Sequence, residues 1–326
     1  MSPAFDDMSI FTGNGSVQLS SDVAEALGTR VSEAIVSKFS NDEIRIQLLE
    51  NVRGKDVFIF QSFPDQVSDR LVELWLMIDA AKRASAGRIT AVVPWYPYSK
   101  QERKFRGREP ISARVVADLT VAAGADRIVT MDLHEGAIQG FFDIPVDHLP
   151  HLPVFLNVFR REGLTGPNTI IVAPDAGAVD RADEIAQRLG CHIAVVFKRH
   201  PNEDVEVART VESVGDLDGM RALLVDDFIF SGSTIVNAAS EVMEAGATEV
   251  NACVTHAIMC GDAPELIGKS DIRTLYTTDT IPTRPEAPDN VTVVSVAPLL
   301  AEALRCIHED RSVSRLLSEI VSQSSE

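Results

Sequence analysis

The stretch Ala222-Leu-Leu-Val-Asp-Asp-Phe-Ile-Phe-Ser-Gly-Ser-Thr234 says most about the fold. Its first four residues form an apolar run typical of a buried strand, and a helical pattern of apolar residues begins at Thr234. Two adjacent carboxylates follow the apolar run. In parallel sheets, ligands bind beyond the carboxyl ends of the strands. We therefore expect Asp226 and Asp227 at the tip of a strand, beside a binding site.

The residues Ser231-Gly-Ser-Thr234 connect this strand to the helix. Successive backbone N–H groups, the hydroxyls and the positive end of the helix would form a cradle for one phosphate group. A Walker A loop is excluded because its Gly-Lys-Ser/Thr ending is missing. Carboxylates beside such a cradle suit a sugar phosphate, through its ring hydroxyls or through hydrated Mg²⁺. The spacing also leaves open an N-capped helix that follows an ordinary acidic loop.

Apolar runs rich in Val, Ile and Thr alternate with segments of helical spacing along the chain, which predicts the α/β class, with mainly parallel sheets flanked by helices. The predicted strands are Val57–Gln61, Ile89–Val93, Ile128–Met131, Thr169–Val172, Ile193–Phe197, Ala222–Val225, Val250–Thr255, Thr274–Thr277 and Val291–Val294. The predicted helices are Ser68–Ala84, Ser112–Ala123, Val179–Leu189 and Thr234–Ala245.

A proline-rich segment, Ile144–Pro153, interrupts this alternation near the middle of the chain. The chain has 326 residues, which agrees with two domains at roughly 150 residues each. We therefore predict one domain over residues 1–150 and a second over residues 151–326.

The composition excludes several classes of protein. The chain has 30 basic and 48 acidic residues, for a net charge of −18, which disfavours binding to polymeric nucleic acid or to anionic membranes. The interrupted apolar runs predict no membrane span, and Met1–Asn14 lacks the features of a signal peptide. The four cysteines show no Cys-x-x-Cys spacing, so we expect reduced thiols and a cytoplasmic location.

The segment from Leu224 to Thr234 resembles the phosphoribosyl-pyrophosphate-binding signature that type I phosphoribosyltransferases share with ribose-phosphate pyrophosphokinases. The resemblance to the pyrophosphokinase family runs from about Ile10 to about Leu317. Five further segments resemble the pyrophosphokinase alone: Asn51-Val-Arg-Gly54, Arg83–Ala91, Tyr96-Pro-Tyr-Ser-Lys-Gln-Glu-Arg103, Arg108–Arg114 and Asp132–Asp143.

This resemblance implies two type I phosphoribosyltransferase-like domains, the first with ATP-binding elements and the second with the ribose 5-phosphate loop and a catalytic lid. It implies that the diphosphoryl group of Mg-ATP passes to the C1 hydroxyl of ribose 5-phosphate. The products would be phosphoribosyl pyrophosphate and AMP, for nucleotide biosynthesis. The family is commonly hexameric, and we expect a homo-oligomer that is at least a dimer.

The resemblance also assigns roles to residues. It implies that ribose 5-phosphate binds to Asp226, Asp227, Ser231, Gly232, Ser233 and Thr234. It implies that ATP contacts Lys100, Gln101 and Arg103, and that Phe39, Asn41, Asp42 and Glu43 read the adenine in a neighbouring subunit. The implied Mg²⁺ partners are His134 and Asp175, and the implied catalytic residues of the lid are Lys198 and His200.

From the residues alone, purely structural explanations remain open for three features in the first half of the chain. Phe39–Glu43 also fits a turn before a strand, and His134 fits a structural hydrogen-bonding role. Residues 100–109 carry five basic and two acidic side chains, which also fits a solvated loop.

Five residues depart from the family pattern. The family usually has Arg at positions 100 and 200, an acidic residue at position 230 and Gly at position 178, and often Asp at position 41, where this chain has Lys100, His200, Phe230, Ala178 and Asn41. His is only partly charged at neutral pH, unlike Arg. These departures define a rival hypothesis, a catalytically weak or inactive regulatory paralogue. A phosphoribosyltransferase that uses a nucleobase is a third, but it leaves the first 150 residues unexplained.

Overall fold

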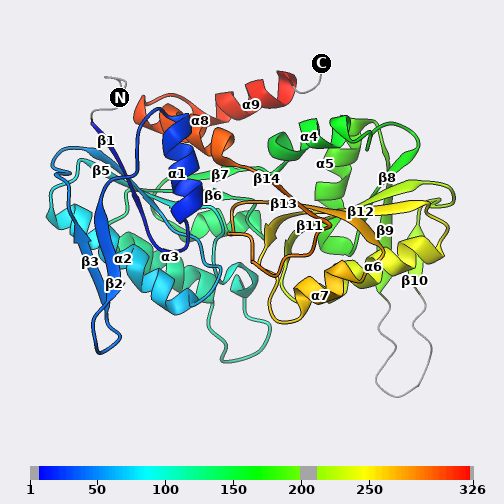
Figure 1. Ribbon diagram of the computed structural model, residues 1–326, viewed down its shortest axis with the longest axis horizontal. Helices are drawn as coiled ribbons and strands as arrows, with labels where there is room; N and C mark the ends of the chain where they lie inside the picture. Colours follow the sequence, from blue (N-terminus) through cyan, green and yellow to red (C-terminus); the bar gives the residue numbers. More distant parts are fainter. Residues whose placement is uncertain (1–6, 199–210, 324–326) are drawn as a thin grey trace. The chain divides into compact units, whose positions relative to one another are not determined.

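The computed structural model describes residues 7–198 and 211–323, which divide into two compact units (Figure 1). Unit 1 contains the residues up to His151 together with Thr280–Pro282 and Ser295–Ile320. Unit 2 contains Leu152–Asp279, Thr283–Val294 and the last residues of the chain, from Val321. The chain therefore returns to unit 1 near its C-terminus, whereas the sequence analysis assigned all residues after 150 to the second domain.

Unit 1 is built on a five-stranded sheet in the order β1-β4-β5-β6-β7, with every neighbouring pair parallel. A separate antiparallel hairpin, β2–β3, packs against α2. Helices α1 and α8 form one helical layer and α2 and α3 another (Figure 1). The elements are β1 (Met8–Thr12), α1 (Val17–Ala26), β2 (Ala34–Lys38), β3 (Ile44–Leu48), β4 (Asp56–Phe60), α2 (Val67–Arg83), β5 (Arg88–Val93), α3 (Ser112–Ala123), β6 (Arg127–Met131), β7 (Val146–Leu149), α8 (Ala297–His308) and α9 (Val313–Gln323), with short 3₁₀ helices η2 (Ser99–Gln101) and η3 (Gly136–Phe141).

Unit 2 is built on a seven-stranded sheet in the order β10-β9-β8-β11-β12-β13-β14, in which only β10 is antiparallel to its neighbour. Its elements are α4 (Leu152–Arg161), β8 (Thr169–Ala173), η4 (Ala176–Ala178), α5 (Val179–Leu189), β9 (His192–Lys198), β10 (Val211–Val214), β11 (Arg221–Ile229), α6 (Ser233–Glu244), β12 (Glu249–Ala257), α7 (Ala263–Gly268), β13 (Ile272–Thr278) and β14 (Val291–Val294).

The central strand β11 is buried on both faces. Ala222 and Leu224 belong to a hydrophobic cluster with α6, whereas Leu223 and Val225 belong to a second cluster with α4 and α5. Burial on both faces explains why the strand appears in the sequence as a continuous apolar run rather than an alternating one.

These sheets and helices confirm the predicted fold class. The predicted bounds of α3, α5 and β14 match those of the structure. The predicted interruption Ile144–Pro153 instead contains β7 and the start of α4. Its prolines are compatible with these elements, because Pro145 precedes β7 and Pro153 lies in the first turn of α4.

The structure corrects the end of the central strand. β11 extends to Ile229, so Asp226 and Asp227 lie within the strand and not beyond its tip. The register with β8 ends at Leu224, whereas the pairing with β12 continues to Ile229. The two carboxylates therefore lie where β11 extends past its shorter neighbour. None of the helices in the described part of the chain is long and apolar enough to cross a membrane.

The loop between β1 and α1 packs tightly against the residues that follow β4. The Gly15 N–H donates a hydrogen bond to Oε1 of Gln61 at 2.9 Å. A Cβ atom at Gly15 would lie 1.9 Å from the carbonyl oxygen of Ser62. Because backbone atoms cannot move aside as a flexible side chain can, no larger residue fits at position 15 without a shift of the loop.

We expect Gly15→Ala to lower the free energy of unfolding by about 1–3 kcal/mol, the usual cost of overpacking a tight site. The change is measured from urea denaturation of both proteins. The matched control is Gly140→Ala, because a Cβ atom at Gly140 would contact nothing within 4 Å. Equal stability of the two variants would contradict this account of the loop.

Candidate functional site

Three neighbouring parallel strands of unit 2, in the order β9-β8-β11, end at the same edge of the sheet. Asp175 follows β8, Asp226 and Asp227 lie near the end of β11, and Lys198 is the last residue of β9. The structure describes the backbone of Lys198 but not its side chain, and His200 lies outside the described residues. The fold therefore brings the predicted carboxylates of unit 2 together at one edge.

The three carboxylates influence one another electrostatically. The pKa of Asp226 is raised to about 7, mainly by burial and further by repulsion from Asp227 and Asp175. The N–H of Asp227 donates to Oδ1 of Asp226 at 2.9 Å, which partly offsets this effect. A buried carboxylate whose neighbours are also carboxylates is costly to ionise, and a bound cation would relieve that cost.

The predicted phosphate loop leads directly into α6. Gly232 adopts a left-handed conformation, with φ of 77°, at the N-cap of the helix, where glycine pays no steric penalty. Ser231 and Ser233 are exposed, and their hydroxyl oxygens lie 3.0 Å apart. The first N–H groups of a helix have no carbonyl partner within the helix, so this turn can bind an anion such as a phosphate group.

Two of the departures from the family pattern have a clear structural setting. Phe230 is 38% exposed beside the phosphate loop, and its ring packs against Phe228 with centroids 4.9 Å apart. It contributes an apolar surface beside the loop. Ala178 has φ of −92° and ψ of 0° at the start of α5. Because φ is negative, this position does not need the left-handed freedom of glycine, and alanine can occupy it.

In unit 1, the segment that carries Lys100 and Gln101 follows β5 and packs against α3. Gln101 accepts a hydrogen bond from the Ser112 hydroxyl at 2.6 Å. Upstream, the buried Tyr96 hydroxyl donates to the Ala113 carbonyl at 2.8 Å, and the Tyr96 ring packs edge-on against Phe142. These contacts fix the start of the segment on α3, and sequence reasoning missed this role of Tyr96.

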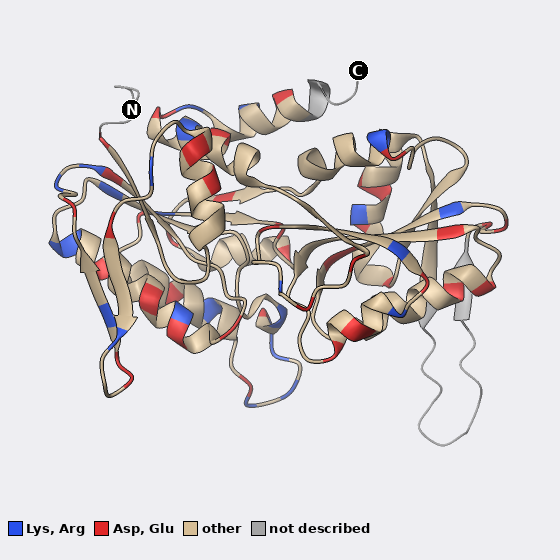
Figure 2. Ribbon diagram, viewed as in Figure 1, with Lys and Arg blue, Asp and Glu red and all other residues tan. Residues whose placement is uncertain are grey.

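Beyond Gln101 the chain forms an exposed loop that is rich in basic residues (Figure 2). Arg103 forms an ion pair with Glu102 at 3.2 Å and lies over the ring of Phe105, 5.0 Å from its centroid. Glu109 accepts hydrogen bonds from two backbone N–H groups, at Phe105 and Arg106. Glu109 thus holds the loop backbone, and Glu102 holds the Arg103 side chain.

His134 lies in a loop after β6 whose backbone is strained. Asp132 has a φ of 42°, a conformation that is uncommon for a residue other than glycine. Asp132 contacts the buried His151 ring at 3.0 Å, and the Leu133 N–H donates to Nε2 of His148 at 2.9 Å. His148 and His151 therefore hold the backbone of the loop that carries His134.

The predicted adenine-reading residues form the tip of the β2–β3 hairpin. The Phe39 N–H donates to the Glu43 carbonyl at 2.8 Å, and Asp42 has a left-handed φ of 66°. The ring of Phe39 is 50% exposed and lies under the Arg45 guanidinium at 5.8 Å. The tip and the loop of residues 100–109 are separate projections of unit 1 (Figure 1).

The described residues contain no group of three or more His, Cys, Asp and Glu side chains arranged to hold a metal ion. Asp175 is exposed, and its Oδ1 accepts the Gly177 N–H at 2.9 Å. The oxygen donors at this edge nevertheless fit Mg²⁺, which prefers carboxylate ligands, retains several waters and takes further ligands from substrate phosphates.

We expect the raised pKa of Asp226 to make stability depend on pH. Its usual value is 3.8 and its folded value is about 7, so the folded state binds the proton more tightly than the unfolded chain. The contribution of Asp226 is therefore fully present below about pH 4 and is lost as the pH rises to about 7. Asp226→Asn should flatten this fall and be more stable than the wild type at pH 8.

Urea denaturation between pH 4 and pH 8, without added metal, measures this difference. The matched control is Asp289→Asn, because Asp289 is an exposed aspartate of the same unit. Parallel curves for the wild type and Asp226→Asn would show that Asp226 does not titrate in this range.

Known proteins match both halves of the chain. Residues 8–124 match the N-terminal domain of ribose phosphate pyrophosphokinase, and residues 198–318 match the phosphoribosyl synthetase-associated domain. The ribose-phosphate pyrophosphokinase of Clostridium acetobutylicum is 44% identical over 314 residues, which cover 96% of this chain and 98% of the relative. The protein of the same name from Caldanaerobacter subterraneus is 45% identical, with the same coverage.

A solved structure agrees with these relatives. The phosphoribosylpyrophosphate synthetase of Mycobacterium smegmatis superimposes with a TM-score of 0.87 and 39% sequence identity, over 94% of this chain and all of that one. The agreement therefore covers the fold of both units as well as the sequence. From these matches we conclude that the chain belongs to the ribose-phosphate pyrophosphokinase family.

Proposed function

We propose that this protein transfers the diphosphoryl group of Mg-ATP to the C1 hydroxyl of ribose 5-phosphate, with phosphoribosyl pyrophosphate and AMP as products. The hydroxyl oxygen forms a bond to the β-phosphorus, and the bond between that phosphorus and the oxygen it shares with the α-phosphate breaks. The hydroxyl proton is released. Such transfers require the protein mainly to position the reactants and to neutralise charge.

The observation that carries this proposal is the arrangement at the edge of β8 and β11. The loop from Ser231 to Thr234 enters α6 with exposed hydroxyls, which suits the 5-phosphate of the sugar. Asp226 and Asp227 lie just before this loop on the same strand. Their carboxylates would accept hydrogen bonds from the ribose hydroxyls and so orient the sugar.

Unit 1 would supply the nucleotide side of the reaction. Lys100 and Gln101 lie on a segment that is fixed to α3, and Arg103 begins the basic loop. The positive charges of Lys100 and Arg103 would neutralise the phosphates of ATP. Phe39 and its neighbours at the hairpin tip would bind the adenine of ATP in a neighbouring subunit, so the proposed enzyme acts as a homo-oligomer.

A Mg²⁺ ion held at this site would neutralise part of the negative charge of the diphosphoryl group. Asp175 would be its best oxygen ligand in unit 2, because it is exposed and lies close enough to Asp226, which neighbours the buried Asp227, to repel its charge. His134 would contact the ion weakly, or act through a phosphate or a water. Lys198, at the end of β9, would stabilise charge that develops on the transferring group.

We expect the purified protein to release AMP when it is supplied with Mg-ATP and ribose 5-phosphate, and EDTA should abolish this activity because Mg-ATP is the proposed donor. The measurement is AMP release, followed chromatographically with and without inorganic phosphate. Nucleotide binding without turnover in either condition would favour the rival hypothesis of an inactive regulatory paralogue. Turnover that depends on a free nucleobase would instead favour a phosphoribosyltransferase.

We expect Lys198→Ala to lower kcat by about 10²–10³-fold, the usual effect of removing one donor that stabilises transition-state charge. Stability in urea should change little. The matched control is Lys269→Ala, an exposed lysine of unit 2 whose ion pair with Glu265 lies within α7 and its C-terminus. A loss of only twofold for Lys198→Ala would remove that residue from the proposed mechanism.

A further inference from the structure

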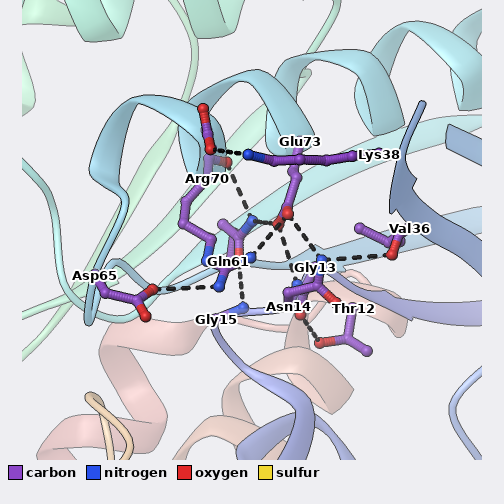
Figure 3. Close-up of polar contacts among 11 residues, drawn as sticks. Thr12, Gly13, Asn14, Gly15, Val36, Lys38, Gln61, Asp65, Arg70 and Glu73 are labelled. Atoms are coloured by element: carbon purple, nitrogen blue, oxygen red, sulfur yellow. Dashed lines mark hydrogen bonds and ion pairs between the residues drawn. The ribbon is translucent and has the colours of Figure 1, made fainter. Parts of the chain in front are cut away.

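A buried carboxylate in unit 1, Glu73 of α2, has no role in the function proposed above. Figure 3 shows it at the centre of a polar network. Glu73 is only 3% exposed. Its oxygens accept hydrogen bonds from the backbone and side chain of Asn14, at 3.2 and 2.8 Å, and from Gln61 and Arg70, each at 2.8 Å. Four donors, one of them cationic, satisfy this buried charge.

The network extends from Glu73 to the β2–β3 hairpin. The Asn14 side-chain amide also makes a long hydrogen bond, 3.5 Å, to the carbonyl of Val36. Val36 lies in the middle of β2 and pairs with Ile46 of β3. Glu73 therefore reaches the hairpin through a single intervening residue.

A second contact joins α2 to the end of β2. Lys38, the last residue of β2, forms an ion pair of 2.6 Å with Asp69 in the first turn of α2. The hydrogen bond from Lys38 to Asp69 raises the pKa of the lysine, which keeps it charged. Asp69 and Glu73 are four residues apart, so they lie on the same face of the helix. One helix face thus holds the hairpin at two points.

These contacts matter because the hairpin has little other support. Within the described residues its sheet has two strands only, and an isolated two-stranded hairpin is marginally stable. Its packing surface is α2. Phe39 follows Lys38 directly, so the ion pair lies next to the first residue of the tip, Phe39–Glu43.

We propose that Asp69 and Glu73 are positioning residues, which fix the direction of the hairpin tip and thereby set how strongly it distinguishes the adenine of ATP from another purine. This inference rests on the proposed function, in which the tip reads adenine. It assigns to α2 a part in nucleotide specificity although neither carboxylate touches the nucleotide.

The test compares Asp69→Asn and Lys38→Met with Asp79→Asn. Asp79 forms an equally short ion pair with Arg83, 2.6 Å, on the same helix but away from the hairpin. Lys38→Met is included because Asp69 also stabilises the start of α2 through the helix dipole, whereas Lys38 does not. Both hairpin variants should lower the ratio of kcat/KM for ATP to that for GTP about two- to fivefold, the range for an exposed ion pair.

The same variants should leave the KM for ribose 5-phosphate and the kcat with ATP unchanged. The double variant Lys38→Asp with Asp69→Lys should restore the ATP preference, because it re-forms the ion pair with its charges exchanged. An unchanged ATP/GTP ratio in both single variants, or an equal fall in Asp79→Asn, would overturn the inference.

A measurement without turnover separates this inference from the proposed function. In Lys38→Met and Glu73→Gln, amide hydrogen exchange should be faster over Ala34–Leu48 and unchanged in β4 and β5. Wild-type exchange in the hairpin of Lys38→Met would overturn the inference whether or not the protein releases AMP. Faster exchange with an unaltered ATP/GTP ratio, in a wild type that does release AMP, would overturn it while the proposed function stands.

Discussion

The parallel pairing of β11 with β8 on one side and β12 on the other is the constraint on which the rest of unit 2 depends. Because β11 is buried on both faces, its apolar residues hold the sheet between two helical layers. Because its register with β8 ends at Leu224 while that with β12 continues, the strand carries Asp226 and Asp227 past its neighbour. The phosphate loop then follows directly, so one strand determines where both the carboxylates and the loop lie.

Two carboxylates of this protein, the buried Glu73 and the partly buried Asp226, have opposite electrostatic surroundings. Glu73 is satisfied by four donors, and its negative charge is compensated by Arg70. Asp226 instead faces two other carboxylates, and burial raises its pKa to about 7. The first arrangement stabilises the fold as it stands. In the second arrangement the ionised Asp226 is destabilised, and protonation or a bound cation would remove that destabilisation. Such an arrangement is typical of sites that bind ligands.

Unit 1 positions its candidate site residues through contacts with residues distant in sequence. The strained Asp132 is held by His151, and Tyr96 fixes the segment before Lys100 to the start of α3. The return of Ser295–Ile320 to unit 1 has a similar basis, because His308 of α8 contacts the Asp56 carboxylate at 3.0 Å. Each of these polar contacts joins groups that are distant in sequence, and it therefore limits the conformations of the chain between them.

The sequence by itself determined the α/β class, the bounds of α3, α5 and β14, and the turn from Ser231 to Thr234 that leads into α6, because periodicity and turn residues report local conformation and burial. It did not predict the antiparallel hairpin or the role of Glu73. The partner of Glu73, Asn14, lies 59 positions away, and a periodic pattern shows that a residue is buried without showing what it contacts. The tertiary structure alone decided which strand ends meet, how far β11 extends, and which carboxylates share one edge of a sheet. Those distances depend on register between strands, and no single segment contains that information.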